Sequence, residues 1–207
     1  METPFTNHLS FEHIYEPAED SFLLMDAIEA DDCWLRETVK PTICLEIGSG
    51  SGIVCSAVAK FLKVFCLATD INSLACRATR ETAQRAEVIV ECVNADLVKP
   101  VVTGKIDMLI FNPPYVPTEN YEVASSNIAH TWAGGLNGRQ VMDRLFPLLP
   151  ELLSERGVLY LVLLEQNRPQ EVERILQMQG LKCQIVMKRR AGIEKLCVLR
   201  ASKAKII

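Results

Sequence analysis

Short apolar runs, rich in β-branched residues, alternate along this chain with longer segments in which apolar residues recur at helical spacing. Such alternation predicts βαβ units, with a parallel sheet between layers of helices. The runs KVFCLA and GVLYLVLL are apolar almost throughout, as expected of strands that are buried on both faces. About seven strands are predicted, from the runs PTICLEI, KVFCLATD, EVIVECV, KIDMLIF, GVLYLVLL, KCQIVMK and KLCVLRA.

Helices are predicted for the segments between these runs, and EDSFLLMDAIEA adds a helix before the first strand. The other helical segments are GIVCSAVAKFL, NSLACRATRETAQRA, GRQVMDRLFPLLPELL and RPQEVERILQMQG. The last two strands, near residues 182–188 and 194–200, are joined by a short polar turn that leaves no room for a crossover helix. We therefore expect these two strands to be antiparallel.

Composition narrows the class of protein. A length of 207 residues and an apolar fraction of 49% predict a single globular domain. The N-terminus lacks the apolar core of a signal peptide, and no stretch approaches about 18 apolar residues, so we expect neither secretion nor a membrane span. The formal net charge of −4 argues against a free-standing nucleic-acid binder, which usually carries a basic surface.

The eight cysteines predict a reducing, intracellular compartment. None stands in C-x-x-C spacing, and most lie in apolar company, as in ICLEI, IVCSAV, VFCLA and LCVL, where a free thiol acts as a small hydrophobe. The three histidines, His8, His13 and His130, share no metal-ligand spacing. We therefore predict neither a disulfide framework nor a metal site.

A glycine-rich turn joins a predicted strand to the helix that follows, in LEIGSGSG (45–52). Gly48, Gly50 and Gly52 would let the backbone turn sharply and let a ligand approach it closely. The spacing is G-x-G-x-G, and Ile53 stands where the dinucleotide-binding fingerprint would have its third glycine. A tight strand–helix turn without a ligand would also use these glycines, so the residues that follow must decide whether the turn binds a ligand.

Two carboxylates end the next two strands. Asp70 ends CLATD, 20 residues beyond Gly50, where an acid can accept hydrogen bonds from the ribose of an adenosine ligand. The alternative for Asp70 is an N-cap of the helix at 72–85. Asp96, in VNADL, can reach an adenine amino group, and an Asx turn is its alternative. Because the glycine turn and both acids share the strand ends where α/β sheets bind ligands, together they favour an adenosine-containing ligand.

The fourth strand ends in FNPPYV (111–116), beside the predicted glycine turn. Asn112 would project from the strand end, and Pro113 and Pro114 lock the backbone behind it. The Asn112 side-chain oxygen and the Pro113 carbonyl are then rigid acceptors for a planar NH2 group, against which Tyr115 can pack. An amide nitrogen is a poor nucleophile, so its positioning beside an electrophilic methyl group is the available means of catalysis. A plain turn is the alternative, since Asn-Pro and Pro-Pro both occur in loops.

Together, LEIGSGSG, Asp70, NADL and NPPY resemble the class I S-adenosylmethionine-dependent methyltransferases, and more narrowly the HemK/PrmC-like protein-glutamine N5-methyltransferases. The segments YEPAEDSF (15–22) and WAGGLNGR (132–139) resemble further motifs of that family. The resemblance covers nearly the whole chain, and it is to the short eukaryotic and archaeal form, without the helical domain of the bacterial members.

The resemblance implies one domain over residues 1–207, with an N-terminal extension and helix (1–40) and a catalytic core (41–207). It implies a Rossmann-like α/β fold, whose seven-stranded sheet has the order 3-2-1-4-5-7-6 and an antiparallel last strand. The implied cofactor is S-adenosyl-L-methionine, and the residues implied to bind it are Ser21, Glu46, Gly48, Gly50, Asp70, Asp96 and Leu97. The implied substrate clamp is Asn112, Pro113, Pro114 and Tyr115.

The substrate implied by the resemblance is the glutamine of the GGQ motif in a class 1 translation release factor. Methylation of a histone H4 lysine and of DNA adenine are alternatives, because the same motif serves other nitrogen acceptors. The acidic net charge and the lack of a target-recognition surface for base flipping argue against DNA. Lysine methylation needs a neutral amine, and the motif contains no dedicated base.

Eukaryotic members of this family form a heterodimer with a small zinc-binding activator, so the resemblance implies such a partner, in the cytoplasm and also in the nucleus. The implied strand order makes EVIVECV (87–93) an edge strand, which offers Val88, Ile89, Val90 and Val93 without the lysine or proline that usually protects an edge. We predict that the activator pairs along this edge by strand addition. A helix or loop of the same chain lying over the edge is the alternative.

Two features remain without a role. The run KRR (188–190) is expected in the turn between the last two strands, on the ligand-facing rim, most simply as a solvated turn. Trp132 belongs either to the core or to the wall of the substrate cleft, and the sequence does not decide between them.

Overall fold

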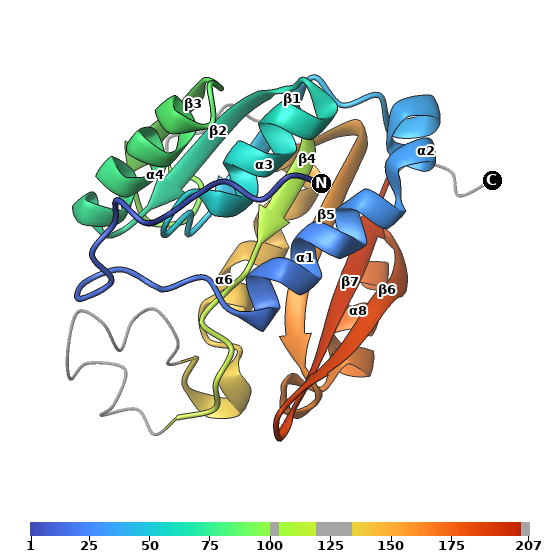
Figure 1. Cartoon of the computed structure of the whole chain (residues 1–207). Helices are drawn as coiled ribbons and strands as arrows, with labels where there is room; N and C mark the ends of the chain where they lie inside the picture. The colour runs from blue at the N-terminus through green and yellow to red at the C-terminus, as the bar shows by residue number, and fades with distance from the viewer. Residues whose placement is uncertain (100–103, 119–133, 204–207) are drawn as a thin grey trace.

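The computed structural model describes residues 1–99, 104–118 and 134–203 (Figure 1). Seven strands form one sheet in the order β3-β2-β1-β4-β5-β7-β6. The predicted fold class and strand order are therefore confirmed. The strands are β1 (Ile43–Ile47), β2 (Phe65–Asp70), β3 (Val90–Asn94), β4 (Ile106–Phe111), β5 (Leu153–Leu164), β6 (Lys182–Ala191) and β7 (Glu194–Ser202).

The strands with the longest apolar runs lie buried in the middle of the sheet. Every residue of β4 is buried, and β5 is buried from Gly157 onward. β1, β2, β3, β4 and β5 pair in parallel, whereas β7 runs antiparallel to both β5 and β6. The antiparallel final pair predicted from the short turn is confirmed. Cysteines in apolar company are buried in the core, namely Cys44, Cys55, Cys66 and Cys197.

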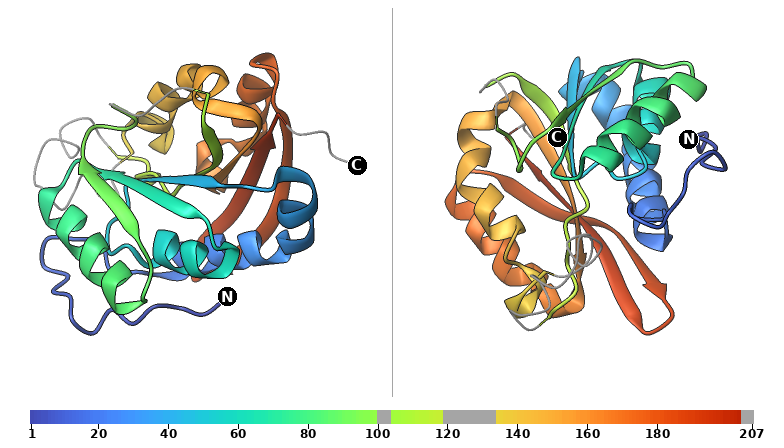
Figure 2. Two further views of the ribbon diagram at one scale, coloured as in Figure 1. Left: turned by 90° about the horizontal axis from the view of Figure 1, so that it is seen from above. Right: turned by 90° about the vertical axis from the view of Figure 1, so that its left-hand side faces the viewer.

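Helices cover both faces of the sheet (Figure 2). Helices α1, α3 and α4 lie on one face, and α6 and α8 lie on the other (Figures 1 and 2). The principal helices are α1 (Glu19–Ala30), α3 (Ile53–Leu62), α4 (Ser73–Arg85), α6 (Met142–Leu145) and α8 (Pro169–Met178). The helix predicted ahead of the first strand coincides with α1.

One predicted helix is wrong in its length. The segment GRQVMDRLFPLLPELL forms only α6, a 3₁₀ turn (Phe146–Leu148) and the short helix α7 (Leu149–Leu152). Pro147 and Pro150 interrupt the segment, because proline lacks the backbone N–H that continues a helix and its ring clashes with the preceding turn.

The expected position of KRR (188–190) is also wrong. These residues belong to β6, whose pairing with β7 continues to Ala191 opposite Glu194. Only Gly192, in the left-handed region at φ 59°, and Ile193 remain for the turn. Arg189 is ion-paired with Asp26 of α1, so this part of the run attaches the β6–β7 hairpin to α1.

The N-terminal segment packs along α4. Ile14 joins Ala75 and Ala78 in a small apolar cluster, against which Leu9 and Phe11 pack. Within the described residues, none of the helices has both the length and the apolar character that crossing a membrane requires.

Candidate active site

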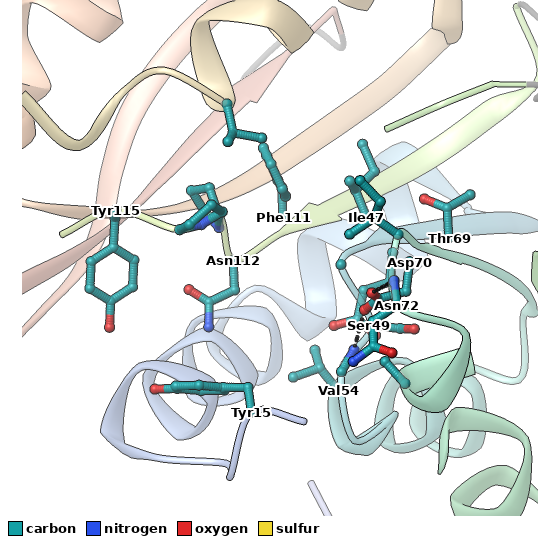
Figure 3. Close-up of a pocket in the computed structure, with 18 of the residues that line it drawn as sticks. Tyr15, Ile47, Ser49, Val54, Thr69, Asp70, Asn72, Phe111, Asn112 and Tyr115 are labelled. Carbon is teal, nitrogen blue, oxygen red and sulfur yellow. Dashed lines mark hydrogen bonds between the residues drawn. The ribbon is translucent and has the colours of Figure 1, made fainter. Parts of the chain in front are cut away.

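A cavity of about 660 Å³ lies at the carboxyl ends of β1, β2 and β4, beside the first turn of α1 (Figure 3). Ligands of open α/β sheets bind at this position. The structure brings every predicted site residue to its wall, and the role of each remains a prediction. They are Ser21, Glu46, Gly48, Gly50, Asp70, Asp96, Leu97, Asn112, Pro113, Pro114 and Tyr115.

Asp70 holds the glycine turn in place. One of its carboxylate oxygens accepts the Gly50 N–H at 2.9 Å, and the other accepts the Asn72 N–H at 2.8 Å. Burial raises the pKa of Asp70, and these two hydrogen bonds oppose the rise. The N-cap role considered for Asp70 is wrong, because Asn72 caps α4 by accepting the Leu74 N–H at 2.9 Å.

Gly52 shows why this turn needs glycine. It has φ of 76°, and a Cβ there would stand 2.5 Å from the Thr79 Cα in α4. Only glycine combines the left-handed backbone with so close an approach of the two helices. Gly48 also has positive φ, but a Cβ there would meet nothing within 4 Å, so its open side is available to a ligand.

Glu46, at the end of β1, is almost fully buried in the cavity wall. Its carboxylate accepts the Cys55 N–H from α3 at 3.0 Å. Burial raises the pKa of Glu46 to about 8, with the nearby charge of Asp70 adding to the rise and the Cys55 hydrogen bonds opposing it. Glu46 is therefore mostly protonated at neutral pH in the folded protein.

Asp96 has a partner that the sequence did not reveal. Its carboxylate accepts a hydrogen bond of 2.5 Å from the Arg144 guanidinium of α6, and both side chains line the cavity. Both side chains remain about half exposed, so this ion pair lies where the cavity wall is accessible to solvent. Next to it, the Leu97 carbonyl accepts the Thr69 hydroxyl at 2.6 Å, which holds this loop against β2.

Asp20 is the centre of hydrogen bonding at the opposite end of the cavity. A single Asp20 oxygen, Oδ2, accepts from the Asn112 amide at 2.9 Å, the Tyr115 hydroxyl at 2.9 Å and the Tyr15 hydroxyl at 3.0 Å. The other oxygen accepts the Ser21 N–H at 2.7 Å. Asp20 is only 2% exposed.

The contact with Asp20 determines which way the Asn112 amide faces. Its Nδ2 must point to the Asp20 carboxylate, because a carboxylate can only accept, so the orientation of oxygen and nitrogen is unambiguous. The Asn112 Oδ1 is then left buried without a hydrogen-bond partner. Figure 3 shows the Asn112 side chain extending from the strand end between Tyr115 and Tyr15. A buried, unpartnered acceptor is costly, and a ligand N–H would satisfy it.

Sequence reasoning did not assign a role to Asp20, although it lies in YEPAEDSF beside the selected Ser21. Acids are common in the first turn of a helix, where the helix dipole favours them, so the sequence did not distinguish Asp20 from its neighbour Glu19. Tyr15 lies in the same segment, but Asn112 and Tyr115 come from the loop after β4, some 90 positions later, and only the fold brings them to Asp20.

The segment WAGGLNGR supports the backbone of the NPPY loop. The Gly134 N–H donates to the Val116 carbonyl at 2.8 Å. A Cβ on Gly138, which has φ of 65°, would overlap the Tyr115 carbonyl oxygen. That oxygen accepts a hydrogen bond of 2.7 Å from the side chain of Asn167, which is fully buried and which the sequence did not single out.

Some predicted features lie outside the described residues, namely Trp132 and His130. Over the ranges 1–99, 104–118 and 134–203, no group of three or more histidine, cysteine, aspartate or glutamate side chains could hold a metal ion.

Comparison with known proteins agrees with the position of this cavity at the strand ends. Residues 21–192 match the family described as "Methyltransferase small domain". The chain is 47% identical to Methyltransferase HEMK2 of Homo sapiens, over 98% of this chain and 97% of that protein. It is 37% identical to the eRF1 methyltransferase catalytic subunit mtq2 of Schizosaccharomyces pombe, over 97% of this chain and 95% of that protein.

Among solved structures, the chain is similar to one from the E. cuniculi Mtq2-Trm112 complex, described as responsible for methylation of the eRF1 translation termination factor. The identity is 30%, the TM-score is 0.72, and the match covers 92% of this chain and 98% of that chain.

Proposed function

The chain belongs to the methyltransferase small domain family, and from that premise we propose that it uses S-adenosylmethionine to methylate the side-chain amide of a glutamine in a class 1 translation release factor. The acceptor would be the glutamine of the GGQ motif. Support for the release factor comes from the mtq2 relative and from the Mtq2-Trm112 complex, both of which are named for eRF1 methylation.

The residues at the strand ends fit S-adenosylmethionine. Gly48 leaves open space beside the turn, and Asp70 uses only one lone pair of each oxygen, so it can still accept from ribose hydroxyls. One Asp96 oxygen accepts a hydrogen bond from Arg144, and the other can accept one from an adenine amino group. When bound, S-adenosylmethionine supplies an electrophilic methyl group. Ser21, Glu46, Gly48, Gly50, Asp70, Asp96 and Leu97 would hold it.

The observation that carries the proposal is the unpartnered Asn112 Oδ1. Because Asp20 holds the amide nitrogen, this oxygen is presented as an acceptor before any substrate arrives. An acceptor held in advance can bind one N–H of a substrate NH2 group and stabilise the positive charge that grows on its nitrogen during methylation.

The Pro113 carbonyl would receive the second N–H of the same group. Pro113 and Pro114 restrict the backbone here. Tyr115, the next residue, is held through its carbonyl, which contacts Gly138 and accepts a hydrogen bond from Asn167. The resulting clamp suits a planar amide, whose nitrogen has few other means of activation than positioning.

The test is the substitution Asn112→Ala. The variant would be co-expressed with the activator and incubated with labelled S-adenosylmethionine and the release factor, and the modified residue would be identified by mass spectrometry. We expect transfer to fall at least about 100-fold, as for loss of a preorganised hydrogen bond to the transition state, while the Kd for the cofactor changes little.

Asn7→Ala makes the same chemical change at an exposed position away from the cavity and should leave transfer unaltered. Undiminished transfer by Asn112→Ala, or label on a residue other than glutamine in the wild-type reaction, would disprove the proposal.

We also propose that a small activator protein binds along β3. This strand is one edge of the sheet, where Val93 is 43% exposed and Ile89, just before the strand, is 72% exposed. The other two side chains predicted at this edge are not offered to a partner, because Val90 is buried in the core and Val88 packs against it. The strand begins at Val90, later than the predicted 87–93, because Glu87 adopts a left-handed turn at φ 60°. No helix or loop of the described residues covers Ile89 or Val93.

The opposite edge supports this choice of surface. Strand β6 carries Lys182, Lys188 and Arg190 at exposed positions, the kind of protection that keeps an edge from pairing. Strand β3 itself contains no lysine, arginine or proline, which favours it as the template for an added strand, although the Arg80 guanidinium of α4 already donates to its Cys92 carbonyl.

Exchange of an exposed apolar side chain for a charge tests the surface. We expect Val93→Lys to abolish co-purification of the activator, whereas Met178→Lys, an equally apolar but 88% exposed position on α8, should retain it. Retention of the activator by Val93→Lys together with Ile89→Lys would place its binding surface elsewhere. The zinc of the activator, methylation of histone H4 and the cytoplasmic and nuclear location stay predictions.

A further inference from the structure

Glu194, the first residue of β7, brings a second carboxylate to the substrate end of the cavity. It lines the cavity together with Tyr15, Asp20 and Tyr115. After burial and the charge of Asp20, the charge of Glu194 also raises the pKa of the Tyr15 and Tyr115 hydroxyls. The carboxylate therefore lies close to the two phenols that flank Asn112.

The position of Glu194 is set by the hairpin that carries it. Arg189 of β6 donates to Asp26 of α1 at 2.5 Å, and Lys195 donates to Glu165, just after β5, at 2.8 Å. These contacts hold the hairpin against two neighbouring elements on either side of the residue. The half-buried Glu194 carboxylate itself has no hydrogen-bond or ion-pair partner among the residues that the structure describes.

Acceptors outnumber donors at this end of the cavity. The Asn112 amide nitrogen and the hydroxyls of Tyr15 and Tyr115 all donate to Asp20. Two side-chain acceptors remain without partners in addition to the Pro113 carbonyl of the clamp, namely the Asn112 Oδ1 and the Glu194 carboxylate. A complementary ligand therefore carries one donor group for the clamp and a second one for Glu194.

The two acceptors differ in charge, so they call for different donors. The Asn112 oxygen is neutral and suits the NH2 of an amide. Glu194 is anionic, and the described part of the cavity wall contains one cationic side chain, Arg144, which Asp96 already neutralises. A charge-assisted hydrogen bond from a cation is about twice as strong as one from a neutral N–H, so a cationic group is the better match for Glu194.

We propose that Glu194 is a specificity-determining residue that pairs with a lysine or arginine side chain of the substrate protein, near the methylated glutamine in the chain. The basic residue must be near, because Glu194 and Asn112 line the same cavity. This inference rests on the proposed function, because it takes the residue bound by Asn112 to be a glutamine of a protein.

Synthetic peptides test it. Two peptides share a central glutamine and differ only in their flanking residues, which are lysines in one and norleucines in the other, since norleucine has the lysine side chain without its amino group. Binding to the complex with the activator is measured by fluorescence anisotropy, and methylation is measured separately by mass spectrometry. We expect the wild type to prefer the lysine peptide, and Glu194→Gln to raise its Kd about tenfold without changing the Kd of the norleucine peptide.

Glu194→Lys should reverse the preference in favour of a third peptide flanked by glutamates. Glu155→Gln removes a carboxylate from an exposed position near the start of β5, away from the cavity, and serves as the control. An unchanged Kd for the cofactor in every variant shows that the cavity remains intact.

The two proposals fail differently in this experiment. Equal binding of the lysine and norleucine peptides by the wild type, or a lysine preference that survives in Glu194→Gln, overturns the role of Glu194 even if the glutamine is methylated. A lysine preference that Glu194→Gln removes supports that role even if no methyl group is transferred, in which case the proposed function fails.

Discussion

Asp20 shows how much one carboxylate oxygen can organise. Three donors converge on its Oδ2, one from Tyr15, five positions earlier in the chain, and two from the NPPY motif. With these donors engaged, the Asn112 oxygen is left as an acceptor. Asp20 thus acts as a positioning residue, through Asn112.

We expect Asp20→Asn to lower kcat by about 100-fold, because an asparagine can turn an N–H toward the donors and allow the Asn112 amide to rotate. The Kd for S-adenosylmethionine should change little, since the glycine turn and Asp70 are untouched. Steady-state kinetics with calorimetric titration of the cofactor would separate the two effects. Asp32→Asn, at an exposed aspartate paired with Arg36, is the control. An equal loss of cofactor affinity would show that Asp20 acts on the cofactor instead.

Glu46 predicts a pH dependence of stability. Its pKa is about 8 in the folded protein against an ordinary 4.5, so between these values the folded state binds the proton and the unfolded chain does not. Stability is therefore lost as the pH rises from about 4.5 through 8, with a slope of up to about 1.4 kcal/mol per pH unit from this group.

Glu46→Gln resembles the protonated form and should remove this part of the slope. Urea unfolding at pH 5, 6.5 and 8 would measure it, with Glu155→Gln as a control in which the slope persists. If Glu46→Gln lost as much stability over this range as the wild type, Glu46 would not be the titrating group.

At the scale of elements, the NPPY loop is supported by segments that follow it in the chain. Gly134 and Gly138, before and within a 3₁₀ turn (Leu136–Gly138), pack against the loop backbone, and Asn167 donates to the Tyr115 carbonyl from the turn after β5. The clamp is thus part of a rigid assembly of loops, with the loop after β5 in contact with it.

Gly138→Ala tests that assembly. An alanine Cβ would overlap the Tyr115 carbonyl oxygen, so the loop must shift and we expect transfer to fall at least tenfold. Gly180→Ala has the same backbone strain, with φ of 84°, but no atom within 4 Å of the added Cβ. It should cost about 1 kcal/mol of stability and leave the transfer rate unchanged. Equal rates for the two variants would show that the loop position does not govern catalysis.

The predicted element boundaries were wrong where a local sequence pattern was compatible with two structures. The apolar periodicity of GRQVMDRLFPLLPELL continues through Pro147 and Pro150, yet the backbone cannot follow it as one helix. The charged run 188–190 resembles a turn, but pairing with β7 extends the strand through it. In both segments, backbone hydrogen bonding overrode a pattern of side-chain polarity.

For the whole molecule, ligand binding at the strand ends should stabilise the fold. Asp70 links the turn after β1 with the end of β2, and the cavity also contacts α1 and the hairpin, so a bound cofactor connects most of the layers. At a cofactor concentration of 100 times Kd, the expected gain is about 2.7 kcal/mol. For a protein of this size, that corresponds to a rise in Tm of roughly 5–10 °C.

Differential scanning fluorimetry with and without S-adenosylmethionine would measure this shift. Asp70→Ala should abolish most of it, while Asn112→Ala should retain it. A full shift in Asp70→Ala would mean that the ligand does not use the predicted ribose site.

The sequence by itself determined the fold class, the strand order through its resemblance, and a set of candidate residues that all line one cavity. These follow from local signals, because hydrophobic period, glycine turns and short motifs are properties of neighbouring residues. Only the tertiary structure decided the orientation of the Asn112 amide, the ion pair of Asp96 with Arg144, and the approach of Glu194 to the two tyrosines. Each of these depends on side chains that are distant in the chain, and a hydrogen bond is sensitive to tenths of an ångström that no pattern of residue types can encode.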